Sequence, residues 1–332
     1  MIDEDALDRA QDKVFDAWEA STSAKRSALA REALAISPLC ADAYVILAFE
    51  AASDEEALDL YAQGVDAGEK ALGQTAFDED AGLFWGLIET RPYMRARQGL
   101  ADTLRELGRH QEAIDHYLGL LRLNPNDNQG VRYALMDVLL ATGRDDEADA
   151  LFQQYSEEDS AAWLYSRALH AFRTAGDGAR SREWLSQAVS ANPHIPDYLS
   201  GKKAMPKSFP AYYSPGDASE AIIYADGARP AWEATEGALV WLISVTSLSD
   251  ADAAANHDQG LNSDAIDRAV LALLYLGLHN GDRVWKGFDW DALDRLHTRG
   301  LISDPATKAK SVRFTEEGLK QSHTAFRELF GK

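Results

Sequence analysis

Apolar residues recur every three or four positions through most of the first 245 residues, which is the spacing of one face of an α-helix. Leu100 and Leu104 form one such face, and Ala113 and Tyr117 form the next one along the chain. Gly108 lies between the two segments, where the chain needs a tight turn. The pattern therefore predicts two antiparallel helices that pack together through their apolar faces.

This pair of helices is repeated along the chain. An alanine followed four residues later by an aromatic residue occurs at Ala57–Tyr61, Ala113–Tyr117 and Ala148–Phe152. The step from 113 to 148 is 35 residues, close to the roughly 34 residues of a tetratricopeptide repeat. The step from 57 to 113 is much longer, so we expect an insertion of about Gly64 to Met94. The predicted fold class is mostly α, with a tetratricopeptide-type α-solenoid.

The chain after the last repeat is expected to close the solenoid. Tyr198–Tyr213 is rich in proline, lysine and aromatic residues, and two helices are expected near Asp217–Ala225 and Pro230–Ser247. A solenoid end exposes an apolar face, so we interpret this region as its cap. The next stretch is small, polar and acidic, as in a linker. The predicted parts are a solenoid at 1–248 with the insertion at 64–94 and the cap at 198–247, a linker at 249–263, and a C-terminal domain at 264–332.

The C-terminal domain is expected to mix helices with short strands. Helices are predicted at Asp264–Leu278 and Trp290–Thr298, and a capped helix follows Thr315. The order of helix, basic tip, short strand and capped helix resembles the recognition helix, wing and closing helix of winged-helix proteins. We therefore expect a small winged-helix-like α+β domain. Three cations would lie where a wing touches a phosphate backbone, namely Lys308, Lys310 and Arg313.

Charge and cysteine content restrict the possible partners and the compartment. The formal net charge is -21, which argues against broad attraction to nucleic acid or to an anionic membrane. Residues 264–332 differ, with 11 Lys and Arg against 10 Asp and Glu. Cys40 is the single cysteine, and the first residues show no apolar signal segment. No apolar run in the sequence approaches the length of a membrane span. We expect a cytoplasmic protein.

Two stretches carry a resemblance to known families. The motifs FWGLIETRPYMRARQGLADTL, EAIDHYLGLLRLNPNDNQGVRY and NPHIPDYLSGKKAMP, within residues 40–245, resemble bacterial tetratricopeptide proteins related to the suppressor-of-tumorigenicity-seven family. Residues 264–332 resemble a small bacterial domain of unknown function. The first resemblance implies an interaction scaffold, and neither implies a catalytic activity.

The repeats also predict a binding groove. In tetratricopeptide arrays the first helix of each pair lines the concave surface, and three first helices were aligned by their turns at Gly108, Gly143 and Gly176. Such a concave, rigid surface is where these folds bind partners. A segment with basic residues facing the carboxylates and acidic residues facing the arginines would suit it. The groove-facing residues are Gln98, Asp102, Arg105, Tyr133, Asp137, Ser166, His170 and Arg173.

Other motifs give weaker indications. Arg91 and Arg95 lie four residues apart and are candidates to hold an anion, or they pair with Glu89, Glu79 or Asp80 and fasten the insertion. No phosphate-binding glycine loop, HExxH motif, nucleophile elbow or paired cysteine motif occurs, and no histidines have metal-ligand spacing. We therefore expect no enzyme activity, no metal and no cofactor.

Three functions of different classes remain. The favoured one is a non-catalytic scaffold that binds a peptide or partner protein in the concave groove. The alternative is a regulator whose C-terminal winged helix contacts DNA, although Asp289, Asp291 and Asp294 on the expected recognition helix favour protein over DNA. The third is an enzyme with a site across the insertion.

Overall fold

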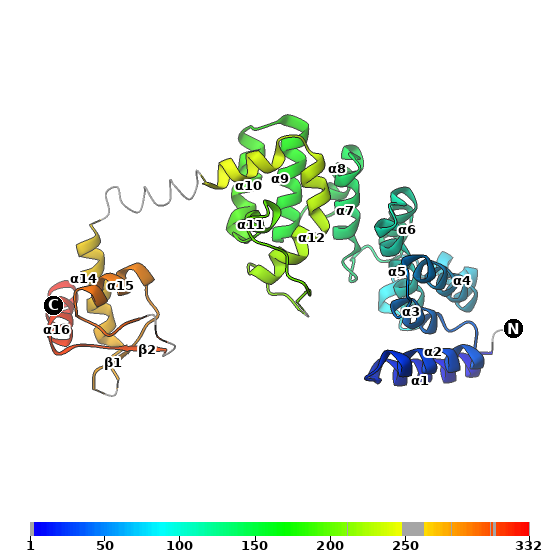
Figure 1. Ribbon diagram of the computed structural model, residues 1–332, viewed down its shortest axis with the longest axis horizontal. Helices are drawn as coiled ribbons and strands as arrows, with labels where there is room; N and C mark the ends of the chain where they lie inside the picture. Colours follow the sequence, from blue (N-terminus) through cyan, green and yellow to red (C-terminus); the bar gives the residue numbers. More distant parts are fainter. Residues whose placement is uncertain are drawn as a thin grey trace. The chain divides into compact units, whose positions relative to one another are not determined.

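The computed structural model of the chain describes residues 3–210, 212–247, 262–279, 281–305, 307 and 310–331. The chain forms two compact units, Met1–Thr246 and Ser247–Lys332 (Figure 1), which we call the solenoid unit and the C-terminal unit. The linker predicted at 249–263 lies outside the described residues except for its last two positions.

The described part of the solenoid unit contains a succession of antiparallel helix pairs (Figure 1). The pairs are α1 (Glu4–Glu19) with α2 (Ser23–Ile36), α3 (Ala41–Phe49) with α4 (Asp54–Glu79), α5 (Arg91–Glu106) with α6 (His110–Leu123), α7 (Val131–Ala141) with α8 (Asp145–Gln154), and α9 (Ala161–Ala175) with α10 (Ala179–Ala191). The first helices α5, α7 and α9 contact one another in that order, so they line one side of the unit. The predicted α-solenoid is confirmed.

Local sequence signals fix the ends of these helices. The hydroxyl of Ser53 accepts a hydrogen bond from the backbone N–H of Glu56 and so caps the start of α4. Gly108, Gly143 and Gly176 have φ angles of 74°, 72° and 74°. This left-handed conformation suits glycine, and it reverses the chain between the two helices of each pair.

The region of the predicted insertion is narrower than expected. Helix α4 runs on past Leu72 to Glu79, with a break at Gly73, and Gly64 and Gly68 pack closely on α5. The chain outside the paired helices is therefore the short stretch between Glu79 and Arg91, which contains the 3₁₀ helix η1 (Phe84–Gly86). The bounds 64–94 were too wide because the longer step between repeats is partly taken up by a longer helix.

The alanine and aromatic pattern marks the interior of the solenoid. Ala113, Tyr117 and Ala148 are fully buried, and Phe152 is nearly so. All four belong to one continuous core that extends from Phe84 to Leu242. Small residues let the paired helices approach closely, and the aromatic rings fill the space between successive pairs.

The end of the solenoid unit is built differently from the predicted cap. After the short helix α11 (Ile195–Leu199), helix α12 (Ala218–Ala234) runs without interruption through Pro230, and a further helix covers residues 238–247. The predicted break at Pro230 is wrong, because the chain turns only at Gly237, where φ is 78°. Helix α12 packs against α7, α9 and α11 (Figure 1). It therefore lies across the side lined by the first helices and covers part of the predicted groove.

The C-terminal unit is a small α+β domain, as predicted. Its elements are α14 (Ser263–Leu276), β1 (Arg283–Trp285), α15 (Trp290–Thr298), β2 (Ser311–Arg313) and α16 (Glu316–Phe330). Strands β1 and β2 are antiparallel, with Val284 opposite Val312 and both side chains buried. In its described residues a strand, not a second helix, directly precedes α15, so the helix-turn-helix pair of a DNA-reading winged helix is not formed there.

Candidate functional site

Three of the predicted groove residues come together where α5 faces α7. Asp102 and Arg105 lie on α5, and Asp137 lies on α7. Each pair of opposite charges among them is close enough to change the pKa values of its members. The hydroxyl of Tyr117 donates a hydrogen bond of 2.5 Å to Asp102 Oδ1 and holds that carboxylate against the core. We call Asp102, Arg105 and Asp137 the concave charge cluster.

Asp137 is held in an unusual environment for a carboxylate. A Cβ atom at Gly227 of α12 would overlap Asp137 Oδ2, so the backbone of α12 lies directly against the carboxylate. Burial raises the pKa of Asp137 to about 7; Arg105 lowers it in part, and Asp226 raises it further. Among the described residues, no hydrogen bond or ion pair satisfies this carboxylate within bonding distance.

Further carboxylates surround the cluster, and the sequence did not single them out. The pKa of Glu106 is raised by burial and by Asp54, Asp102 and Asp226, although Arg105 lowers it in part. Asp226 comes from α12, which the sequence pattern assigned to the end of the solenoid. The signal that could have placed it here is Gly227, since a glycine inside a helix indicates close contact with another element.

The remaining groove residues are engaged elsewhere. Gln98 accepts a hydrogen bond of 2.7 Å from the side-chain amide of Gln129. Ser166 is only 3% exposed because α12 covers it, and its hydroxyl interacts with the hydroxyl of Tyr224 on α12. Gln98 lies on the same helix as Asp102 and Arg105, but its side chain bonds to Gln129. Ser166 is buried and does not line an open groove.

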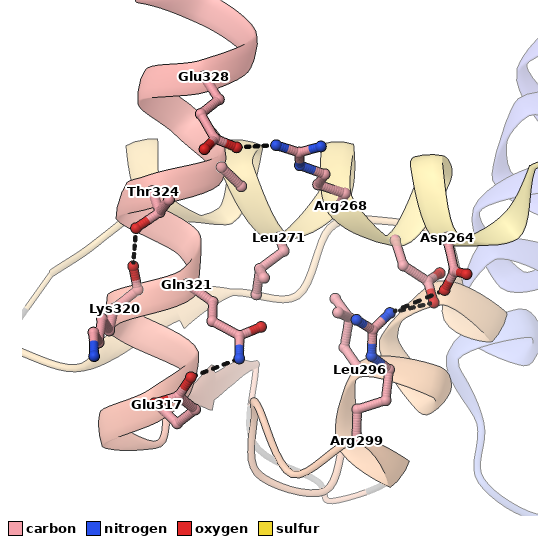
Figure 2. A pocket seen from close by; sticks show the side chains of 12 residues that line it. Asp264, Arg268, Leu271, Leu296, Arg299, Glu317, Lys320, Gln321, Thr324 and Glu328 are labelled. Carbon is pink, nitrogen blue, oxygen red and sulfur yellow. Dashed lines mark hydrogen bonds and ion pairs between the residues drawn. The ribbon is translucent and has the colours of Figure 1, made fainter.

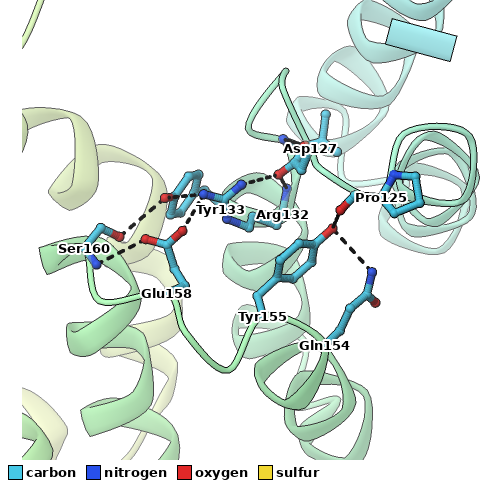
Figure 3. Close-up of polar contacts among 9 residues, drawn as sticks. Pro125, Asp127, Arg132, Tyr133, Gln154, Tyr155, Glu158 and Ser160 are labelled. Carbon is cyan, nitrogen blue, oxygen red and sulfur yellow. Dashed lines mark hydrogen bonds and ion pairs between the residues drawn. The ribbon is translucent and has the colours of Figure 1, made fainter. Parts of the chain in front are cut away.

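Tyr133 belongs to a polar network between α7 and the loop before α9 (Figure 3). Arg132 donates hydrogen bonds to Asp127, Glu158 and the Tyr133 hydroxyl, and its guanidinium lies over the rings of Tyr133 and Tyr155. The Asp127 carboxylate is fully buried, so Arg132 compensates a buried charge. Tyr133 therefore helps to hold the repeat that contains α7 against the repeat that begins with α9.

His170 and Arg173 point toward α8. The His170 imidazole lies 3.6 Å from carboxylate oxygens of both Asp145 and Asp149, and its ring packs on Phe152. Arg173 pairs with Asp145 and donates to the backbone carbonyl of Leu140. Neither side chain joins the concave charge cluster, because both contact residues of the preceding helix pair, α7 and α8.

Arg91 and Arg95 are also occupied. Arg95 Nε donates to Asp42 Oδ1 at 2.8 Å, and its guanidinium lies over the Trp18 ring. Asp42 is fully buried, so this pair joins α5 to α3 over a separation of 53 residues. Arg91 donates to the backbone carbonyl of Trp85 at 3.0 Å. These partners differ from the expected ones, which were Glu79, Asp80 and Glu89. Both arginines line an apolar cleft of about 380 Å³.

The cations predicted in the C-terminal unit have mixed outcomes. Lys308 lies outside the described residues. Lys310 is exposed, and Arg313 pairs with Asp282 at 3.6 Å.

A cleft of about 430 Å³ lies between α14 and α16, and Figure 2 shows Arg268 paired with Glu328 and Arg299 reaching Asp264. These two arginines are therefore already compensated by carboxylates.

The described residues offer neither a metal-binding cluster nor a membrane-spanning helix. No group of three or more His, Cys, Asp or Glu side chains is arranged there to hold a metal ion. Within the same residues, no helix has both the length and the apolar character that crossing a membrane requires.

Comparison with known proteins gives two family matches. The family described as ST7 protein matches residues 1–251, and the domain of unknown function DUF6429 matches residues 262–332. Uncharacterized protein y4hR of Sinorhizobium fredii (strain NBRC 101917 / NGR234) is 59% identical over 70 residues, which are 21% of this chain and 95% of y4hR.

A human relative and a solved structure are similar to this chain at lower identity. The human suppressor of tumorigenicity 7 protein-like is 30% identical over 249 residues, covering 67% of this chain and 43% of that protein. The chain thus spans less than half the length of this relative. The crystal structure of YrrB, described as a TPR protein with an unusual peptide-binding site, has a TM-score of 0.41 and 19% identity, covering 56% of this chain and 84% of YrrB.

Proposed function

The chain belongs to the ST7 protein family, and from this premise we propose that it is a non-catalytic interaction scaffold that binds a basic segment of a partner protein at the concave charge cluster. The observation that carries the proposal is Asp137, a carboxylate without a cation in bonding distance on the side lined by the first helices. Leaving a half-buried carboxylate unpaired costs stability, and a binding site is a common reason for such a cost.

The charge balance around Asp137 indicates what the partner must supply. Asp102, Glu106, Asp137 and Asp226 bring four carboxylates, and Arg105 brings one guanidinium. A lysine or arginine side chain entering between Asp102 and Asp137 would favour the ionised form of both. Arg105 remains available for a carboxylate of the same segment, because no side chain in the described part of the unit forms an ion pair with it.

Helix α12 limits where the segment can lie. It covers Ser166, and its residues Asp226 and Gly227 border the cluster. The partner segment therefore lies along α5 and the edge of α7, on the side of α12 away from α9. This is a shorter groove than three exposed first helices would provide, so a few basic positions decide the affinity.

We predict that a lysine-containing peptide binds this face more tightly than its glutamate counterpart. The probes are fluorescein-labelled Gly-Ser-Lys and Gly-Ser-Glu repeat peptides of equal length, titrated at physiological salt and followed by anisotropy. The lysine peptide should bind about tenfold more tightly, because its ammonium groups meet carboxylates that lack cation partners. The double variant Asp102→Asn/Asp137→Asn should remove most of this difference.

The control separates a local site from the general acidity of the chain. Asp5→Asn/Asp12→Asn changes the net charge by the same amount on α1, away from the cluster. This variant should keep the lysine peptide bound at nearly the parent affinity. An equal loss in both double variants would show nonspecific charge attraction and contradict the proposed site.

A further inference from the structure

The outer face of the two-stranded sheet in the C-terminal unit carries an unusual set of side chains. Strand pairing places Val284 and Val312 on the inner face, where both are buried in the core. Since side chains alternate along a strand, Arg283, Trp285 and Arg313 share the opposite face, and all three are exposed. We call this surface the β1–β2 outer face.

Two arginines lie directly opposite each other on this face. The strand register pairs Arg283 with Arg313, and like charges in such cross-strand positions destabilise a sheet. Arg313 pairs with the carboxylate of Asp282 at 3.6 Å. No carboxylate in the described part of the chain compensates Arg283, and Lys310 adds a further exposed cation just before β2. The face thus carries excess positive charge although the C-terminal residues 264–332 are nearly neutral.

Trp285 lies beside these cations with an open ring face. It is 59% exposed, and Ser311, a small residue, is its cross-strand neighbour. The imidazole of His279 stacks on one side of the indole, with ring centroids 4.7 Å apart and an interplanar angle of 22°. A hydrogen bond of 2.9 Å between His279 Nδ1 and the Gly277 carbonyl orients the imidazole. Among the described residues no second ring stacks on the indole, so its exposed side can accept a flat ring.

We propose that the β1–β2 outer face binds single-stranded nucleic acid, with a base stacked on Trp285 and neighbouring phosphates on Arg283, Arg313 and Lys310. Exposed aromatic rings set among cations are the usual platform for unpaired strands, since every base offers a flat face. A purely anionic protein partner would use the cations but leave the indole without a role. Duplex DNA would not present a base to the ring.

Arg295 on α15 and Arg299 just after it favour the single strand over the duplex for a second reason. Arg295 pairs with the buried carboxylate of Asp267 at 2.8 Å, and Arg299 lies 3.6 Å from the same residue. Side chains fixed in this way are not available to read base edges in a major groove. The expected recognition helix therefore serves the interior of the unit, whereas Arg283 on the sheet has no carboxylate partner among the described residues.

The test uses the full-length chain and a fluorescein-labelled oligothymidine, with anisotropy measured over a range of salt concentrations. We expect a dissociation constant of roughly 10⁻⁵ M and a log–log salt slope near -2, since about three phosphates are contacted at -0.7 each. Trp285→Ala should weaken binding by about tenfold at every salt concentration, whereas Trp285→Phe should retain most of the affinity. Arg283→Ala should reduce the salt slope by about one phosphate contact.

Matched controls lie in the same unit. Trp290 is similarly exposed, but Lys286 covers its ring, so Trp290→Ala should leave binding unchanged. Arg268→Ala removes a cation already paired with Glu328 and should leave the salt slope unchanged. The proposal is overturned if well-folded Trp285→Ala binds normally, if a thymidine–adenine duplex binds more tightly than the single strand, or if polyglutamate or phosphatidylserine vesicles bind equally well.

Discussion

Replacement of Gly318 by alanine is expected to unfold the C-terminal unit. Gly318 lies in the first turn of α16, and a Cβ atom built there would overlap the carbonyl oxygen of Leu301. That oxygen cannot move aside easily, because it accepts a hydrogen bond of 3.0 Å from the backbone N–H of Thr315. Forcing a methyl group against fixed backbone costs about 3 kcal/mol or more. A unit of this size is stabilised by only roughly 5 kcal/mol, so most of its stability would be lost.

Hydrogen exchange resolved by peptide is the suitable measurement, because it reports on each unit separately. Peptides from α14 to α16 should lose protection in Gly318→Ala. We propose that the two units fold separately, so peptides from α1 to α12 should keep theirs. Gly287→Ala is the matched control: apart from its chain neighbours, no atom of the described residues lies within 4 Å of the added methyl group. Full protection of α16 in Gly318→Ala would contradict the predicted overlap, and loss of protection in both units would contradict their independence.

Local patterns predicted the solenoid because its repeats are held together mainly by neighbours in sequence. Helices α5 and α6 of one pair pack together, Tyr117 on α6 bonds to Asp102 on α5, and the turn at Gly108 is decided by a single backbone conformation. The resemblance to the suppressor-of-tumorigenicity-seven family is confirmed over residues 1–251. Each of these features is encoded within one repeat length, which is the range over which periodicity carries information.

Contacts between distant segments were not predictable in the same way. Arg95 finds its partner in Asp42, although nearer carboxylates are available in the sequence. Pro230 was expected to interrupt a helix, yet α12 accommodates it and continues to Ala234. A proline removes one backbone donor, and packing of α12 on α7 and α11 is sufficient to keep the helix intact.

The concave charge cluster shows both the reach and the limit of repeat alignment. Alignment on the glycine turns placed Asp102 and Asp137 at equivalent positions, and Arg105 one turn further, and the structure brings the three together. The same alignment placed Ser166 in an open groove, where α12 in fact covers it. Side chains at equivalent repeat positions lie on the same face of their helices. Repeat alignment does not show whether another element, such as α12, covers that face.

Replacement of Asp137 by asparagine is expected to stabilise the solenoid unit at neutral and alkaline pH. The pKa of Asp137 is raised from 3.8 to about 7 by burial, with a further contribution from Asp226. The folded state therefore binds the proton more tightly than the unfolded state, and ionisation costs stability as pH rises from about 4 to 7. Asparagine has the shape of the protonated acid but does not ionise. The variant should be more stable by on the order of 2–4 kcal/mol at pH 8 and similar to the parent below pH 4.

Urea unfolding of the parent and of Asp137→Asn at several pH values between 4 and 8 measures this difference. The parent should lose stability across that window, and the variant should show a smaller loss because one titrating group is gone. Asp5→Asn on the exposed face of α1 is the control, and its pH profile should follow the parent. If Asp137→Asn is less stable than the parent at pH 8, the carboxylate is stabilised by a cation in the folded state. The unpaired charge that we propose as the binding determinant would then not exist.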